Sequence, residues 1–346
     1  MKSPREHTRK TQKKAMANRT SSSQLHTVTL PEELAAVCVA ADVFILLSNI
    51  MVLLTFNKLG KLTIQHYLML GLVGSDLTML IGNAMLTIFI FMREVWLTDV
   101  GCFLVGCLTL TAAMITASIH ICLSIDRWVT VAYPYAYREY SMNQKSKQMA
   151  LVVILLIHVF PGPALFLTWW FDQLKFYFDP LVAYCLADFG AKGGAGLILS
   201  SAVSIVFPCF IEVPAYTYII WRISKMKGTN RCHIVKAVRT VLVTLGVYYV
   251  CWLPMGIWVV WDIVSPDLHP PSWFPFFTIQ MLVINSGMSC IVYYFTLPKF
   301  KEAFLNATML GKCFSSLSKI RLENIPAARP TPSECPATGS KTLADC

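Results

Sequence analysis

The fold is decided by residues 102–134, which read CFLVGCLTLTAAMITASIHICLSIDRWVTVAYP. This stretch is apolar for almost its whole length, and no charged residue occurs between Cys102 and Asp126. As an α-helix, the segment from Cys102 to Arg127 rises roughly 38 Å at about 1.5 Å per residue, which is enough to cross a bilayer. A soluble helix of this length usually keeps an exposed polar face. We therefore predict that the stretch is a transmembrane helix.

The composition extends this prediction to the whole chain. Hydrophobic residues make up 55% of the 346 residues and charged residues 14%, whereas soluble domains carry about 25% charged residues. Hydrophobic segments long enough to span a bilayer occur at residues 34–57, 64–92, 101–133, 148–171, 194–222, 234–262 and 273–297. The predicted fold class is an all-α membrane protein, a seven-transmembrane helix bundle with a short amphipathic eighth helix.

We expect four regions along the chain: a disordered extracellular N-terminus, the bundle, the amphipathic helix and a cytoplasmic tail. Their predicted bounds are 1–33, 34–297, 298–313 and 314–346. The loops after the first, third and fifth segments carry most of the loop lysines and arginines, which places these loops in the cytoplasm and the N-terminus outside. The basic N-terminus opposes this orientation, but the loops outweigh it. The net charge of +10 favours anionic membrane lipid and acidic partners over nucleic acid.

Most of the segments also carry a recognisable motif, and the motifs follow one another in order along the chain. The matching residues are Asn49, Asp76, Cys102, Asp126-Arg127-Trp128, Pro208, Tyr216, Tyr248, Cys251-Trp252-Leu253-Pro254 and Ser289-Cys290-Ile291-Val292-Tyr293. Taken together, this pattern resembles the rhodopsin-like G-protein-coupled receptors. Three departures stand out. The fourth segment lacks the tryptophan that the family carries near its middle, and Ile154 is the nearest match. Cys290 replaces the usual proline, which predicts a straighter seventh helix. Thr109 stands where amine receptors carry an aspartate, which counts against an ordinary monoamine ligand.

The resemblance implies a receptor that passes the signal of an unidentified extracellular ligand to a heterotrimeric G protein, and not an enzyme. It also implies the plasma membrane as location, and arrestin and a receptor kinase as further partners. A retinal-type photoreceptor is disfavoured, because no lysine for a Schiff base occurs between Trp273 and Pro298. A transporter is disfavoured, because the sequence shows no repeated halves.

The resemblance assigns roles to particular residues. It pairs Cys102 with Cys185 in a disulfide on the oxidising side of the membrane. The implied G-protein switch consists of Asp126, Arg127, Tyr216 and Tyr293. The implied hinge consists of Pro208, Tyr248, Trp252 and Pro254. The implied ligand pocket is lined by Thr109, Leu110, Met114, Trp252, Ile257, Trp258, Gln280 and Val283.

A polar core around Asp76 is the one cofactor site that the resemblance implies. Its residues are Asn49, Asp76, Thr116, Asn285, Ser286 and Ser289. They supply oxygen atoms of the kind that a hard cation requires, so a structural sodium ion at Asp76 is expected. The alternative is a protonated or water-bonded aspartate without an ion. No other cofactor is expected.

Several residues outside these motifs remain candidates. Asn18 lies in a glycosylation sequon, which also arises by chance, and Cys313 is either palmitoylated or a free thiol. We hypothesise a hydrogen bond between Glu212 and His120, because a lone acid in the membrane is costly. The alternative is a protonated Glu212 bonded to a backbone carbonyl. Asp42 is either a contact for a cationic ligand or an acid bonded to neighbouring side chains.

Overall fold

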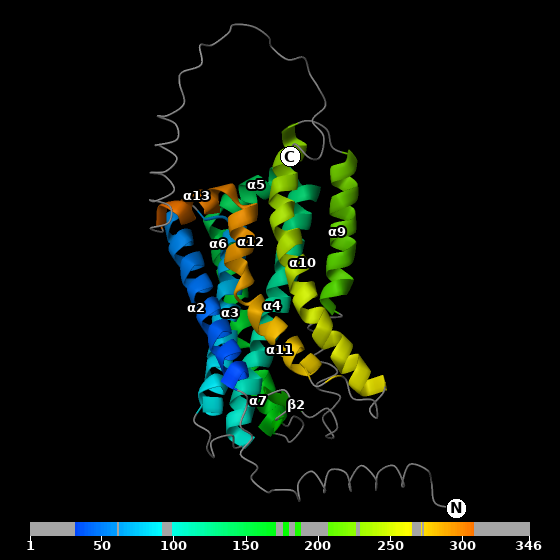
Figure 1. The fold of residues 1–346 in the computed structure, drawn as a ribbon. Coiled ribbons are helices and arrows are strands. Elements are labelled where there is room, and N and C mark those ends of the chain that lie inside the picture. The colour runs from blue at the N-terminus through cyan, green and yellow to red at the C-terminus, as the bar shows by residue number, and fades with distance from the viewer. Residues whose placement is uncertain are drawn as a thin grey trace, which may run out of the picture.

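The computed structural model describes residues 32–60, 62–91, 99–170, 176–179, 184–187, 207–225, 229–264, 271 and 273–307. The helices that form its bundle stand side by side (Figure 1). They are α2 (Glu32–Lys58), α3 (Ile64–Phe91), α4 (Asp99–Ala132), α6 (Gln144–Val159), α7 (Pro161–Trp170), α9 (Phe207–Lys225), α10 (Thr229–Val264), α11 (Trp273–Asn285) and α12 (Met288–Thr296). The predicted modification sites Asn18 and Cys313 lie outside the described residues.

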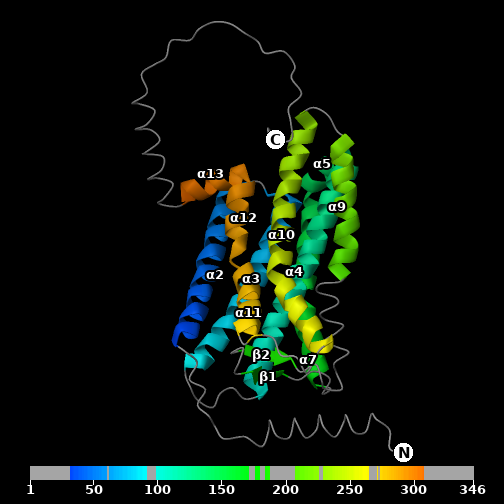
Figure 2. The same cartoon turned by 45° about the vertical axis from the view of Figure 1, so that its right-hand side comes forward.

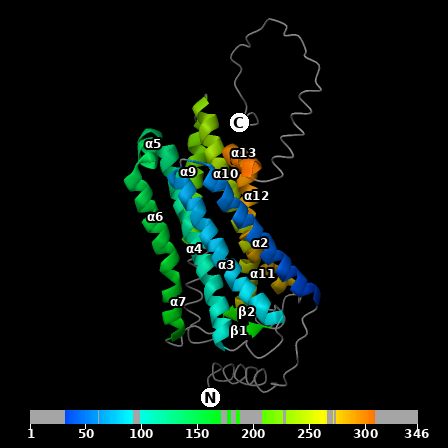
Figure 3. The ribbon, with the colours of Figure 1, turned by 90° about the vertical axis from the view of Figure 1, so that its left-hand side faces the viewer.

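The described helices agree with the predicted multi-pass bundle. Within the described residues, five candidate spans are long and apolar enough to cross a membrane: α2, α3, α4, α10 and the pair α6–α7. The helices α11 and α12 form a sixth if the bent pair is one span. The predicted segment at 194–222 begins outside the described residues, and α9 covers its remainder. The pair α6–α7 stands at the edge of the bundle (Figure 3), where its side chains are free to contact lipid.

Two elements mark opposite ends of the bundle. The antiparallel strands β1 (Phe176–Asp179) and β2 (Tyr184–Ala187) form a hairpin at one end, which we call the hairpin end. The helix α13 (Pro298–Ala307) lies across the other end, which we call the α13 end (Figure 2). The short helix α5 (Pro134–Met142) also lies at the α13 end. The sequence predicted α13 from residue 298 onward but predicted neither α5 nor the hairpin.

Local chemistry explains where α5 and α6 begin. Pro134 stands in the first turn of α5, where its missing N–H is not needed for a helix hydrogen bond. The side chain of Asn143 then accepts a hydrogen bond from the backbone nitrogen of Lys145 at 2.9 Å and caps α6. These two signals turn the chain at the α13 end of the bundle.

The hairpin packs onto α4 because α4 carries a glycine at the contact. Phe176 of β1 is buried beside Phe103 of α4, with their ring centroids 6.1 Å apart. A Cβ atom at Gly106 would overlap the ring of Phe176. Gly106 therefore lets the hairpin approach the bundle closely.

The prediction of a straighter seventh helix was wrong. α11 and α12 meet at an angle of 52°, with the break at Ser286 and Gly287 and without a proline. Two side chains of α2 donate hydrogen bonds to the carbonyl oxygens at the break: Asn49 Nδ2 donates to that of Ser286 at 3.0 Å, and Ser48 Oγ donates to that of Gly287 at 2.5 Å. A Cβ atom at Gly287 would overlap the ring of Phe44, so α2 also requires glycine at the break.

Candidate functional site

The predicted disulfide is confirmed. The sulfur atoms of Cys102 and Cys185 are 2.03 Å apart, and the bond joins the first turn of α4 to β2. Both cysteines are buried in an apolar cluster at the hairpin end, which also contains Phe103, Phe176 and Tyr184. The bond therefore holds the hairpin over that end of the bundle.

Most of the predicted pocket residues gather beneath the hairpin. The hydroxyl groups of Thr109 and Tyr184 are 2.9 Å apart, and the Thr109 hydroxyl also donates to the carbonyl oxygen of Val105 at 2.8 Å. Val283 is buried in the same apolar cluster, and a further set of predicted residues packs against it: Leu110, Met114 and Trp258. Since Tyr184 contacts Thr109 directly, the hairpin reaches the position at which amine receptors carry an aspartate.

Three other predicted pocket residues have different surroundings. Trp252 is buried deeper in the bundle, where its ring centroid lies 5.5 Å from that of Tyr248. Gln280 is buried beside α2, and its side-chain nitrogen lies 3.7 Å from the sulfur of Cys38. Ile257 is 48% exposed and belongs to none of the buried clusters of the described residues. The structure thus sets Ile257 apart from the other pocket candidates.

The predicted polar core lies midway along the bundle. Asp76 is 3% exposed, and its Oδ2 accepts a hydrogen bond from Ser289 Oγ at 3.0 Å. Next to it is a cavity of about 20 Å³, which is room for about one water molecule or a small ion. The polar residues that line this cavity are Asp76, Thr116, His120, Thr244, Asn285 and Ser289.

The donors around this cavity fit a hard cation. Carboxylate, hydroxyl and amide oxygens are the ligands that such an ion prefers, and Asp76, Thr116 and Asn285 supply one of each. The Ser286 side chain hydrogen-bonds Asp76 as well. Asn49 acts differently, because its side chain joins α2 to the backbone oxygen of Ser286 at the break between α11 and α12. His120 was not predicted to face this cavity, and its Nδ1 has no hydrogen-bond partner among the described residues.

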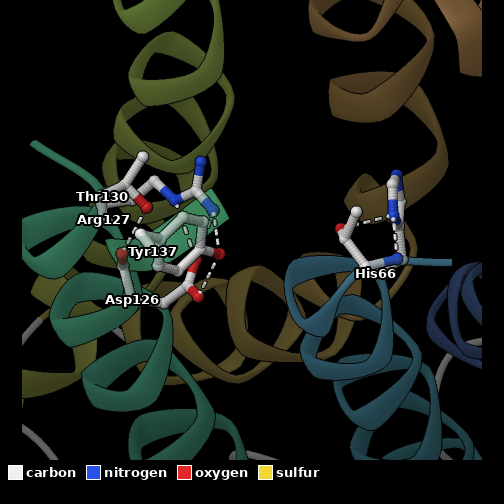
Figure 4. Close-up of polar contacts among 6 residues, drawn as sticks. His66, Asp126, Arg127, Thr130 and Tyr137 are labelled. Atoms are coloured by element: carbon white, nitrogen blue, oxygen red, sulfur yellow. Dashed lines mark hydrogen bonds and ion pairs between the residues drawn. The ribbon is translucent and has the colours of Figure 1, made fainter. Parts of the chain in front are cut away.

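The predicted switch residues Asp126 and Arg127 are both buried near the α13 end of α4 and form an ion pair (Figure 4). Arg127 Nε donates to Asp126 Oδ2 at 3.0 Å, and Arg127 Nη2 contacts the same oxygen. The other oxygen, Oδ1, accepts a hydrogen bond from the hydroxyl of Tyr137 on α5 at 2.6 Å. Asp126 therefore holds Arg127 and α5 at the same time.

Tyr137 was missed by the sequence reasoning, because α5 itself was not predicted. Burial raises the pKa of the Tyr137 phenol above its usual value, and the negative charge of Asp126 raises it further. The hydroxyl therefore stays protonated at physiological pH and remains a donor to Asp126.

The remaining switch and hinge residues lie on α9, α10 and α12. Tyr216 on α9 and Tyr293 on α12 are buried, and neither hydroxyl makes a hydrogen bond with a described residue. Pro254 lies inside α10 and removes one of its backbone hydrogen bonds, and Pro208 is buried near the start of α9. The ring of Tyr248 lies 4.7 Å from that of His120, so α10 packs against α4 at that level.

The hypothesised bond between Glu212 and His120 was wrong. Glu212 Oε2 instead accepts a hydrogen bond from the hydroxyl of Tyr249 on α10, and Cys209 Sγ lies 3.3 Å from the same hydroxyl. His120 faces the polar-core cavity and Tyr248, so it is turned toward α10 and α12 rather than toward α9. The adjacent tyrosines Tyr248 and Tyr249 were the sequence signal for this arrangement, since one faces each neighbouring helix.

Residues 48–293 match the family described as 7 transmembrane receptor (rhodopsin family), and the match covers more than half of the chain. The chain therefore belongs to the rhodopsin-like family of seven-transmembrane receptors.

Similar proteins include receptors named after chemically different ligands. Trace amine-associated receptor 5 from Homo sapiens is 25% identical over 313 residues, which cover 84% of this chain and 89% of the relative. Free fatty acid receptor 3 from Mus musculus is 25% identical over 299 residues, which cover 84% of this chain and 92% of the relative. Sphingosine 1-phosphate receptor 3 from Takifugu rubripes is 28% identical over 148 residues, or 41% of this chain and 34% of the relative. These relatives are receptors and not enzymes.

Proposed function

We propose that this chain is a receptor that passes the signal of an extracellular ligand to a heterotrimeric G protein by rearranging its helices. The observation that carries the proposal is the buried ion pair of Asp126 and Arg127, held by Tyr137 at the α13 end. A buried arginine that is tied to a neighbouring acid can be released when the packing of the helices changes. The α13 end is accordingly the cytoplasmic end, and the hairpin end is extracellular.

The mechanism is a shift between two helix arrangements. A ligand beneath the hairpin stabilises one arrangement, and a G protein that binds the same arrangement receives the signal. The proline inside α10 and the break between α11 and α12 are the points at which these helices can bend. In the arrangement described here, Arg127 contacts Asp126, which is the state expected before activation.

The buried tyrosines are the proposed partners of Arg127 in the other arrangement. The hydroxyl groups of Tyr216 and Tyr293 make no hydrogen bonds with described residues, and leaving such groups unpaired in a protein interior costs free energy. A movement that brings Arg127 or water to these hydroxyls would recover that cost. The active arrangement would thus gain hydrogen bonds that the arrangement described here does not make.

A sodium ion is proposed for the polar core. Asp76, Thr116, Asn285 and Ser289 would hold it, and its positive charge would neutralise the buried carboxylate of Asp76. Because Asp76, Thr116, Asn285 and Ser289 lie on α3, α4, α11 and α12, an ion held by them would connect these four helices, and α10 closes the cavity beside them with Thr244 and Val247. The ion would then favour the arrangement in which the cavity keeps its present shape.

The plasma membrane, arrestin and a receptor kinase are further parts of the proposal, and family membership is their support.

The test is a screen of cells that express the full chain, with second-messenger readouts for each major class of G protein and an unliganded baseline. We expect at least one readout to change with expression or with a compound, and to disappear in the variant Arg127→Ala at equal surface expression. If Arg127→Ala signals as well as the wild type, the proposed route through this arginine is wrong.

A further inference from the structure

Asp42 lies in the hairpin half of the bundle, seven residues before Asn49 on α2 and so about 10 Å closer to the hairpin end. Its Oδ1 accepts a hydrogen bond from Asn83 Nδ2 at 2.7 Å, and its Oδ2 accepts one from Thr87 Oγ1 at 2.9 Å. Both donors are neutral side chains of α3. A carboxylate oxygen can accept a second hydrogen bond, so each of these oxygens keeps capacity for a ligand.

The described residues supply no positive charge to Asp42. Its only hydrogen-bond partners among them are the two neutral groups, and the lysines and arginines of the described helices lie toward the α13 end. A partly buried carboxylate without a counter-charge pays a desolvation cost that two neutral donors offset only in part. A positively charged ligand would offset the remainder.

A second acceptor lies on the adjacent helix. The side-chain oxygen of Gln280 on α11 is buried and has no hydrogen-bond partner among the described residues, and Gln280 as a whole is 7% exposed. Its amide nitrogen contacts the sulfur of Cys38, which stands one helical turn before Asp42 on the same face of α2. Gln280 is thus turned toward the face of α2 that carries Asp42.

The apolar cluster at the hairpin end contains residues next to these groups in the sequence, so Asp42, Thr87 and Gln280 lie at the same level of the bundle as this cluster. Ala41, Leu86 and Ile279 are the sequence neighbours of Asp42, Thr87 and Gln280, and all three belong to the buried cluster that also contains Tyr184. Burial raises the pKa of the Tyr184 phenol to about 12, and the negative charge of Asp42 adds to this effect, so the carboxylate lies within electrostatic reach of the hairpin.

We infer that Asp42 and Gln280 form the recognition site for an organic ammonium ligand, with Asp42 as the counter-charge and the Gln280 oxygen as a second acceptor. This inference rests on the proposed receptor function and assigns its ligand a chemical class. The site differs from that of ordinary amine receptors, because the acid is on α2 and Thr109, which occupies their acid position, is bonded to Tyr184. At this site Asp42 would repel a head group that is itself a carboxylate or phosphate.

The test measures ligand-induced thermal stabilisation of the purified full chain in lipid nanodiscs, without G protein. The probes are a panel of primary, secondary and quaternary ammonium compounds led by 2-phenylethylamine. Each amine is matched with a carboxylate of similar shape, and 3-phenylpropanoate is the partner of the lead compound. We expect one or more amines to raise the unfolding temperature and their matched carboxylates to have no effect.

Three variants connect any stabilisation to the site. Asp42→Asn keeps the shape of the side chain but removes its charge, and should weaken amine binding by at least about 30-fold. Gln280→Met removes the second acceptor at similar volume and should weaken binding less. The control Glu139→Gln removes one negative charge at an exposed position of α5 and should bind the amines like the wild type.

The inference is overturned if no amine of the panel stabilises the wild type, if the carboxylates stabilise it equally, or if Asp42→Asn binds the amines undiminished. Because Gln280→Met leaves Asp42 in place, it tests the site even if Asp42→Asn folds poorly. Amine binding without any G-protein activation would leave the site intact and refute the proposed function instead. If expression of the chain alone activates a G protein and no amine binds, the proposed function stands and the inferred site is refuted.

Discussion

Removing the hydroxyl of Tyr137 should raise the basal activity of this receptor. In the variant Tyr137→Phe, Asp126 Oδ1 loses the hydrogen bond that it accepts at 2.6 Å, while the contacts between Asp126 and Arg127 remain. A hydrogen bond to a charged group contributes about 1.5–3 kcal/mol. Because Tyr137 is only partly buried, we take the lower end, about 1.5 kcal/mol, which is roughly tenfold in an equilibrium constant.

The expected size of the change follows from the population of the active arrangement. If about 1% of the wild-type receptor is active without ligand, about 10% of Tyr137→Phe should be active. The assay is unliganded nucleotide exchange on a purified G protein by receptor in nanodiscs. Tyr135→Phe is the matched control, because Tyr135 lies on the same helix and is 90% exposed.

The pH dependence provides a second check on this prediction. The pKa of Tyr137 is raised, so its phenol remains protonated below the usual value near 10 and loses its proton only above it. The difference between Tyr137→Phe and the wild type should therefore be constant from about pH 6 to 8. Unchanged or lowered basal exchange in Tyr137→Phe, with normal folding, would refute the reasoning that Asp126 and Tyr137 restrain Arg127.

Three further predictions test other parts of the structure. Cys102→Ser and Cys185→Ser should each lower the unfolding free energy by about 2–5 kcal/mol and reduce surface expression to a similar extent. The double variant should lose little more than either single variant, and additive losses would contradict the disulfide. Gly287→Ala should lower the unfolding free energy by about 1–3 kcal/mol because its Cβ meets the ring of Phe44, and Phe44→Ala in the same chain should recover part of this loss. Replacing sodium by a large organic cation should lower the unfolding temperature of the wild type, whereas Ser289→Ala should show a smaller dependence on sodium, and equal dependence would argue against the ion site.

The membrane segments could be predicted from the sequence because they depend on a simple chemical requirement. A membrane span requires a long apolar stretch, and residues 102–125 form such a stretch without a charged residue. Cys102 and Cys185 could be paired by family resemblance without any knowledge of the loop between them. The order of the motifs along the chain also fixed which helix carries each candidate residue.

The partners of buried polar groups could not be predicted in the same way. Glu212 accepts a hydrogen bond from Tyr249 rather than from His120, because the rotation of α9, α10 and α4 about their axes decides which side chains face each other. Sequence spacing gives no direct measure of that rotation. Tyr137 was missed because it comes from a short helix outside the spans. Polar partners across helices depend on packing between segments that are distant in sequence.

The bend of the seventh helix shows a related limit. Proline is the usual cause of a sharp bend in a helix, so Cys290 in its place predicts a straighter helix. The break instead occurs at Ser286 and Gly287, where side chains of α2 donate hydrogen bonds to both carbonyl oxygens and Phe44 occupies the space that a Cβ atom of Gly287 would fill. A glycine near the centre of a membrane helix was the available signal, but its reason lies on another helix.

The most direct test of the central claim is whether G-protein activation passes through Arg127. The measurement is unliganded nucleotide exchange in the background of Tyr137→Phe, with and without Arg127→Ala. The proposed switch predicts that Arg127→Ala abolishes the raised exchange, while Arg138→Ala, which removes an exposed positive charge on α5, leaves it unchanged. If the raised exchange persists without the guanidinium group of Arg127, the ion pair with Asp126 is a packing feature and the account of the switch is contradicted.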